Sequence, residues 1–386
     1  MEGKKKFSLT SAILSVICVV FVAEAAAPVA AIGNSQFFWW IFLLIAFLLP
    51  YGLISSELGT TYIGEGGIYD WVTKAYGHRW GARVSWYYWI NYPLWLASLA
   101  VMTPELLTTI TGIKFSTPMM IISVIIFNLL GFEVICTFAD DMENPKKQIP
   151  QAIVAAGLVI AAIYIFSAFG IGVAIPTDQI STGSGMMDSF KLLTGSTEGW
   201  FIMLMAFLFL LTLFGNMISW SLGVNNTACY AAENGDMPKF FEKRSKKNDM
   251  PIGAALMNGI VASVVIVLAP ILPNQDLFWA FFSLNVVLFL LSYIPVFPAF
   301  YKLRKIDPDT PRPFKVNGKP GFLKVLVVLP MIMIIISLIF TAVPLDFSPA
   351  ALNEKLPITI GAIIFILFGE VIIYVKKIKK GTKENG

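Results

Sequence analysis

Ten apolar stretches of about 20 residues each constrain this chain more than any other feature. Because a helix rises about 1.5 Å per residue, each stretch is long enough to cross a hydrocarbon core of roughly 30 Å. A content of 57% apolar and 13% charged residues excludes a soluble globule. We therefore expect an all-α polytopic membrane protein. The ten expected spans are Ser11–Ala31, Phe37–Ser56, Val84–Thr103, Pro118–Phe138, Ala152–Ile175, Trp200–Trp220, Ile252–Leu272, Leu277–Phe300, Val325–Val343 and Ile358–Val375.

Lysine and arginine fall almost entirely on one side of the expected membrane. With the N-terminus inside, 25 of the 28 lie in inner segments, and only Lys114, Lys191 and Lys355 lie outside. Because cationic flanks stay in the cytoplasm, both termini are expected there, in a multi-pass protein of the inner (cytoplasmic) membrane. The net charge of +4 then reflects topology. No basic run is interleaved with aromatic residues, so nucleic acid is excluded as a partner.

The residues that enzymes and metal sites need are scarce. The one histidine, His78, lies in an expected cytoplasmic loop, and no cluster of His, Asp and Glu accompanies it. We therefore expect neither catalysis nor a bound metal or cofactor. The three cysteines, Cys18, Cys136 and Cys229, are scattered along the chain and are expected to be packing thiols. The glycines at 64–67 lack the Lys-Ser/Thr step of a phosphate-binding loop, so we expect a tight turn there.

The first and fourth stretches each contain one glutamate beside residues that loosen a helix. Pro28 follows Glu24 by four residues and would leave the Glu24 carbonyl without its donor, while Gly131 precedes Glu133 by two. Breaks at mid-depth expose backbone amides and carbonyls that can bind the carboxylate and the ammonium group of an amino acid, so the pattern matches a zwitterionic substrate. Glu24 is a candidate partner for the substrate's amine or a candidate proton carrier. The structural alternative, a protonated Glu24 that is hydrogen-bonded to a neighbouring carbonyl, stays open. For Glu133, substrate contact and a purely structural tie are equally supported.

The predicted substrate site combines the two breaks with polar side chains of other spans. Its residues are Glu24, Ala25, Ala26, Ala27, Asn128, Gly131, Glu133, Tyr88, Asn91 and Ser219, with Pro28 and Gly131 as helix breaks and Glu24 as the proton-coupling candidate. Further polar side chains that could line a cavity are Tyr87, Asn216, Ser283 and Asn285. For each one singly, ordinary interhelical hydrogen bonding is favoured.

Other features of the sequence have mainly structural explanations. Glu57, at the inner end of the second span, is expected to cap a helix or pair with a cytoplasmic base. Glu370 is expected to serve packing or self-association. The segment 176–199 has room for a short surface helix or lid. Tryptophans near span ends are expected to form interfacial belts; these are Trp39, Trp40, Trp80 and Trp200.

Several motifs together resemble a known family. They are Ser56-Glu57-Leu58-Gly59 followed by Gly66-Gly67-Ile68-Tyr69 and Trp71, Gly131-Phe132-Glu133 leading into Glu143-Asn144-Pro145-Lys146-Lys147 and Ile149-Pro150, the run from Ala231 to Pro238, and Arg312-Pro313-Phe314-Lys315-Val316. They occur in the same order in the amino acid-polyamine-organocation superfamily of permeases. The chain is most similar to the branch that contains glutamate/GABA exchangers.

This resemblance implies one transporter domain over 1–386, built as a five-plus-five inverted repeat. The first half-repeat would cover about 8–111, the second about 112–303, and two additional helices about 322–376. The chain departs from the family between Thr103 and Pro118, where a short loop replaces the family's fourth and fifth helices.

The function implied is secondary active transport of amino acids or related amines by alternating access, as proton symport or exchange. A non-transporting relic or a binding-only membrane protein is the alternative, because the absent hairpin includes a helix that gates the inner side. The sequence leaves open whether the chain forms homo-oligomers.

Overall fold

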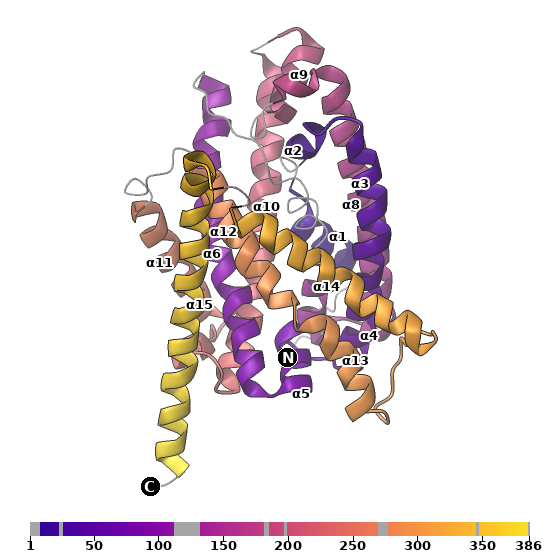
Figure 1. Ribbon diagram of the computed structural model, residues 1–386, viewed down its shortest axis with the longest axis vertical. Coiled ribbons are helices and arrows are strands. Elements are labelled where there is room, and N and C mark those ends of the chain that lie inside the picture. Colours follow the sequence, from indigo (N-terminus) through magenta and orange to yellow (C-terminus); the bar gives the residue numbers. More distant parts are fainter. Residues whose placement is uncertain are drawn as a thin grey trace.

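A computed structural model of the protein describes residues 8–22, 26–111, 132–180, 185–196, 199–268, 277–344 and 347–384. Within these ranges every extended regular element is a helix, and none is a β-strand (Figure 1). The helices are α1 (Leu9–Val20), α2 (Ala26–Ala30), α3 (Ser35–Leu43), η2 (Leu44–Leu48), α4 (Leu49–Thr61), α5 (Ile68–Tyr76), α6 (His78–Thr111), η3 (Phe132–Asp141), α8 (Pro145–Ala174), η4 (Thr177–Gln179), α9 (Gly185–Thr194), α10 (Trp200–Glu233), η5 (Lys239–Glu242), α11 (Ile252–Leu268), α12 (Leu277–Tyr293), α13 (Val296–Ile306), α14 (Pro320–Ala342) and α15 (Pro349–Glu384). The expected all-α membrane architecture is confirmed.

Six helical segments of the described chain are long and apolar enough to cross a membrane. They are Ser35–Thr61, Pro145–Ala174, Trp200–Glu233, Ala280–Ile306, Pro320–Ala342 and Ala351–Val375. Each coincides with one of the ten expected spans. The expected third span lies within α6, and the expected seventh span begins with α11 and continues beyond Leu268 outside the described residues. Most of the expected fourth span lies outside the described residues, and its last part falls in η3.

A π-helical turn, η2, interrupts the second span just before a proline. Pro50 is the second residue of α4 and has no amide hydrogen, and its ring would crowd the carbonyl one turn earlier. The wider π turn, Leu44–Leu48, relieves this conflict without ending the span. The segment from Ser35 to Thr61 therefore stays one continuous membrane helix.

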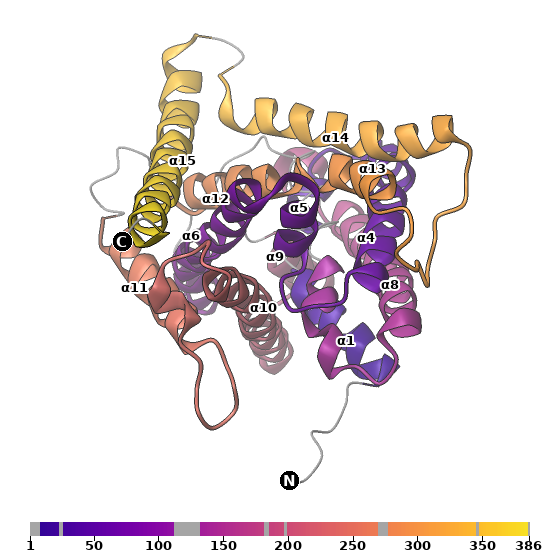
Figure 2. The same cartoon turned by 90° about the horizontal axis from the view of Figure 1, so that it is seen from below.

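The helices form a bundle with a buried centre and a lipid-facing periphery. The long helices α6, α10 and α12 pack against one another, and α1 and α2 lie against α8. Helices α11, α14 and α15 lie on the outside (Figure 2). Most of the Ala280–Ile306 span is buried, whereas most of the Ala351–Val375 span is exposed. The core of the bundle is therefore built by the central helices, and α15 offers most of its surface to lipid.

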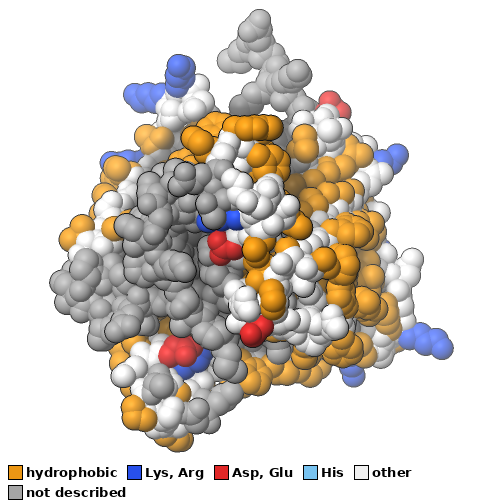
Figure 3. All heavy atoms as spheres, turned by 90° about the horizontal axis from the view of Figure 1, so that it is seen from above, with side chains coloured by type: hydrophobic (Ala, Val, Ile, Leu, Met, Phe, Trp, Pro, Cys, Tyr) orange, Lys and Arg blue, Asp and Glu red, His pale blue; other side chains and the backbone are white. Residues whose placement is uncertain are grey.

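The two ends of the bundle differ in their elements. Helix α9 lies at one end, and α5 and α13 lie at the other (Figure 1). At the α9 end the described surface shows few charged side chains among apolar ones (Figure 3). Helix α9 confirms the short surface helix expected within 176–199. The expected tight turn is also confirmed: residues 64–67 lead into α5, and Gly67 has a φ of 50° that favours glycine.

Candidate functional site

The first membrane span is broken. Helix α1 ends at Val20, and Phe21 is extended with φ −75° and ψ 119°. Helix α2 then begins at Ala26. The interruption thus lies ahead of Pro28, which stands in the first turn of α2, a position where a helix tolerates proline. The last carbonyls of α1 are left without partners in their own helix.

Side chains from two other helices bind the backbone at this break. The Tyr164 hydroxyl on α8 accepts a hydrogen bond from the Val22 amide at 2.9 Å and donates one to the Val20 carbonyl at 3.3 Å. The Asn216 Nδ2 on α10 donates to the Val19 carbonyl at 2.7 Å. Buried backbone groups need such partners, so these two side chains stabilise the broken conformation.

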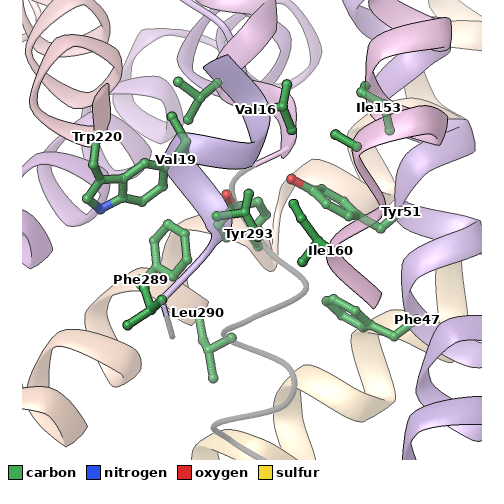
Figure 4. Close-up of a cluster of buried hydrophobic side chains, with 14 of the residues drawn as sticks. Val16, Val19, Phe47, Tyr51, Ile153, Ile160, Trp220, Phe289, Leu290 and Tyr293 are labelled. Atoms are coloured by element: carbon green, nitrogen blue, oxygen red, sulfur yellow. The ribbon is translucent and has the colours of Figure 1, made fainter. Parts of the chain in front are cut away.

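A small cavity adjoins the broken end of α1. Three aromatic rings and one amide from α6, α10 and α12 complete its wall. Its lining is Val19, Val20, Val22, Trp95, Asn216, Trp220 and Phe289. In Figure 4, Val19, Trp220 and Phe289 approach one another from α1, α10 and α12. The cavity has room for about one water molecule, so a larger ligand requires the helices to separate.

The chemistry of this wall favours a cation. The carboxyl end of α1 carries the negative end of the helix dipole, and its carbonyls accept hydrogen bonds. Aromatic faces attract ammonium and guanidinium groups. The lining residues include no lysine or arginine that could pair with a carboxylate. The wall therefore suits an amine or guanidinium group.

The structure brings some of the predicted site residues near this cavity. The Tyr88 ring contacts those of Trp220 and Phe289, with centroids 5.7 and 6.0 Å apart. Asn91, fully buried on α6, donates to the Tyr88 carbonyl at 2.6 Å. Ser219 on α10 is half-buried and is not part of the cavity lining. Tyr88 therefore packs on the aromatic wall, and none of these three residues is part of the lining.

The other predicted residues lie on α2 or outside the described chain. Ala26 and Ala27 are buried on α2, and Gly185 of α9 packs closely on Ala27. The remaining predicted residues, and the side chain of Glu133, lie outside the described parts; they are Glu24, Ala25, Asn128 and Gly131.

The second expected break is followed by an unusual helix. The segment η3 is a 3₁₀-helix of 10 residues, although runs beyond three or four residues are uncommon. A Cβ added at Gly59 of α4 would lie 2.4 Å from the Cys136 sulfur, and one added at Gly223 of α10 would lie 2.4 Å from Val134. Two glycines thus allow η3 to pack directly against its neighbours.

The cavity contains aromatic residues that the sequence did not single out. Trp95, Trp220 and Phe289 look like ordinary apolar residues of their spans, and Tyr164 shares no motif with the α1 break. Trp40 was expected in an interfacial belt, but this prediction is wrong. Its ring is fully buried and stacks on Tyr164 at 5.4 Å. A tyrosine or tryptophan in the middle of an apolar span was the available signal, because a buried hydroxyl or indole needs a partner.

Two motifs far apart in the chain meet in a buried ion-pair cluster at the α5 and α13 end. The Glu57 carboxylate is 1% exposed and accepts bonds from Arg304 Nε at 2.7 Å and from the Val316 amide at 2.7 Å. A second Arg304 nitrogen also bonds it, and Arg312 Nε lies 3.5 Å away. The expected pairing of Glu57 with a base is confirmed.

Glu370 packs α15 against α6 through arginines. Its carboxylate accepts hydrogen bonds from Nε and Nη2 of Arg83 on α6, the latter at 3.0 Å. Arg79 lies 3.8 Å away. Glu370 therefore fixes α15 on α6 through an ion pair, which agrees with the expected role in packing; self-association stays a prediction.

Further polar contacts tie the loops at this end. The Asp236 carboxylate is bound by the Tyr69 hydroxyl at 2.7 Å and by His78 Nδ1 at 2.8 Å. The Tyr62 hydroxyl donates to Asp307 at 2.8 Å, and burial together with this bond raises the pKa of Tyr62 to about 12. Bonds from Thr310 and Tyr62 lower the pKa of Asp307. These contacts pair loops that lie far apart in the chain.

A helical membrane bundle whose first span breaks around a buried cavity has the architecture of a secondary transporter. The family model for amino acid permeases matches residues 7–127 and 102–369. The chain is also 62% identical to the probable agmatine/putrescine antiporter AguD of Lactococcus lactis subsp. lactis (strain IL1403), over 96% of this chain and 95% of that protein. The chain belongs to the amino acid permease family and is a membrane transporter, not an enzyme.

More distant relatives include other amine and amino acid carriers. The putrescine transporter PotE of Haemophilus influenzae (strain ATCC 51907 / DSM 11121 / KW20 / Rd) is 27% identical over 52% of this chain and 46% of its own. The glutamate/gamma-aminobutyrate antiporter of the same Lactococcus strain is 23% identical over 62% of this chain and 48% of its own. The AguD alignment runs over 444 residues, more than the 386 of this chain, so it includes positions filled only in AguD.

Proposed function

We propose that this protein exchanges small organic amine cations without a carboxylate across the membrane, with agmatine and putrescine as the first substrates to test. One observation carries this proposal: the carbonyl end of α1 meets three aromatic rings in a cavity whose lining has no basic side chain. An amino acid would bring a carboxylate that this wall cannot pair. The name of the 62% identical relative supports the same substrate class.

In this mechanism the broken first span binds the amine, and two acidic residues supply charge. We propose that Glu24, two positions beyond Val22, is the counter-ion of the amine or carries a proton in exchange for it. For Glu133, which follows the second break, we keep both roles open, substrate contact and a structural tie. The remaining predicted residues of the breaks would contribute backbone groups; they are Ala25, Asn128 and Gly131.

We also propose the topology and the membrane. Both termini would be cytoplasmic, with the α5 and α13 end facing inward in the cell's inner membrane. Arg304 and Arg312 cluster at that end, which agrees with the preference of cationic residues for the cytoplasmic side. The domain would be a five-plus-five repeat with a shortened first half.

A second candidate is a protein that binds amines without moving them. The alignment of 444 residues against a chain of 386, and the two family matches that overlap at 102–127, support the absence of a segment near that point. We propose that this segment is the family's fourth and fifth helices. If one of them is needed to open the inner side, binding would survive and transport would not.

The test of the substrate class is a thermal-shift titration of the purified protein in detergent. A ligand at 100 times its dissociation constant adds about 2.7 kcal/mol to the unfolding free energy. Agmatine and putrescine should raise the melting temperature, and glutamate should not. The Trp220→Leu variant should lose the shift, whereas Trp200→Leu, at a position 76% exposed, should keep it. No shift with either amine, or an equal shift with glutamate, overturns the proposal.

A further inference from the structure

We propose that, before substrate binds, the Asn216 amide donates to the Val19 carbonyl in place of the substrate's N–H group, and that an entering amine displaces it. Asn216 would thus set the affinity for amines by competing with them. This inference rests on the proposed function and adds a residue that controls it.

The geometry fixes the amide in one orientation. Asn216 is 2% exposed; its Nδ2 donates to the Val19 carbonyl at 2.7 Å, and its Oδ1 accepts from Trp95 Nε1 at 3.1 Å. Because an indole N–H can only donate, Trp95 requires the amide oxygen on its side. The NH₂ group must therefore point toward α1. Val19, Trp95 and Asn216 all border the cavity, so both hydrogen bonds of the Asn216 amide join residues of its wall.

Of the two side chains that bind the break, Asn216 makes the contact that is easier to release. Both α1 and α2 lie against α8, and Tyr164 of α8 binds backbone groups on each side of Phe21. Helix α10 also packs on α1, and within the described residues it supplies one hydrogen bond to the break, that of Asn216. Separating α1 from α10 therefore costs one hydrogen bond there, whereas separating it from α8 costs two.

An amine substrate is a stronger donor than the amide it would replace. Hydrogen bonds from a charged nitrogen are about twice as strong as those between neutral groups. The carbonyl of Val19 should therefore exchange the neutral Nδ2–H of Asn216 for an ammonium or guanidinium N–H. The hydrogen bond from Trp95 to Oδ1 would remain, so the Asn216 side chain stays in place while the bond from its NH₂ group to the Val19 carbonyl breaks. Binding would open the link between α1 and α10 and make movement of the broken span depend on substrate.

The test compares Asn216→Leu with Tyr164→Phe by calorimetric titration of agmatine into the purified full-length protein. Removing the competing donor should tighten agmatine binding by about three- to tenfold, the value of one net hydrogen bond. Tyr164→Phe keeps every side chain of the cavity lining in place and frees the Val20 carbonyl only from a longer bond of 3.3 Å, so it should not tighten binding. If Asn216→Leu does not give a monodisperse protein, Asn216→Ala tests the same loss of the donor.

The outcomes separate this inference from the proposed function. If agmatine binds more tightly to the Asn216 variant and not to Tyr164→Phe, the result supports competition between the Asn216 amide and the amine. Wild-type binding together with unchanged or weaker binding to the variant overturns it and makes Asn216 a support or a direct ligand. Failure of the wild-type protein to bind agmatine removes the proposed function, and this inference with it.

Discussion

The buried carboxylate of Glu57 gives the sharpest prediction about stability. Glu57→Gln keeps the shape of the side chain but removes the charge that faces Arg304 and Arg312. Breaking a buried ion pair costs about 3–5 kcal/mol, because the remaining charge stays desolvated. Arg304 and Arg312 are 15% and 7% exposed, so water can relieve only part of this cost. We expect a loss of about 3 kcal/mol in unfolding free energy.

The local effect should appear in the segment that Glu57 holds in place. The Val316 amide loses a charged acceptor, so the segment from Asp307 to Lys319 should loosen from the end of α4. This segment contains a trypsin site at Lys315, which is followed by Val316. We expect a lower melting temperature in detergent together with faster tryptic cleavage after Lys315, read by mass spectrometry.

A matched control shows whether the loss of stability comes from burial of the ion pair or from the loss of any ion pair. Glu370 also forms a two-pronged pair with arginine, but its side chain is 31% exposed. Solvent screening limits such pairs to about 1 kcal/mol or less, so Glu370→Gln should cost much less. Equal losses for the two variants, or unchanged trypsin cleavage in Glu57→Gln, would refute the reasoning.

Three further predictions concern single contacts. Tyr164→Phe leaves a buried amide and carbonyl of the α1 break unpaired and should lower the unfolding free energy by about 1–3 kcal/mol in chemical denaturation; a change below the error of measurement would contradict its role. Asp307→Asn should destabilise the protein near neutral pH. Because Thr310 and Tyr62 lower the pKa of Asp307, this difference in melting temperature should persist above its ordinary value of 3.8 and vanish as the pH falls below it; a constant difference would contradict this. Gly223→Ala places a methyl group against Val134 and should cost about 1–3 kcal/mol in thermal unfolding, whereas Gly215→Ala, with open space around it, should not.

The sequence predicted the helical membrane fold well because hydrophobic length is a local property. A run such as Pro320–Ala342 cannot be stable in water or as a lipid-facing loop, so composition alone determines its state. The pairing of Glu57 was also predictable in kind, because a carboxylate at a span end needs a cation. Its partners Arg304 and Arg312 were not, since they lie about 250 residues away.

The candidate site was less predictable because tertiary packing builds it. The unsatisfied backbone of a broken helix can be anticipated from proline and acidic residues, but nothing local shows that Tyr164 and Asn216 bind it. Trp40 illustrates the same limit. A tryptophan near a span end is usually interfacial, yet here its neighbour Tyr164 offers a buried stacking surface.

The central claim, exchange of amine cations, is tested most directly by counterflow in proteoliposomes. Vesicles loaded with unlabelled putrescine should take up labelled agmatine from outside, and empty vesicles or vesicles loaded with glutamate should not. The Trp220→Leu variant should lose this uptake, and the Trp200→Leu variant should retain it. Uptake of labelled agmatine that does not depend on internal amine would contradict exchange. If the protein binds agmatine but putrescine-loaded vesicles take up none, the result would contradict transport.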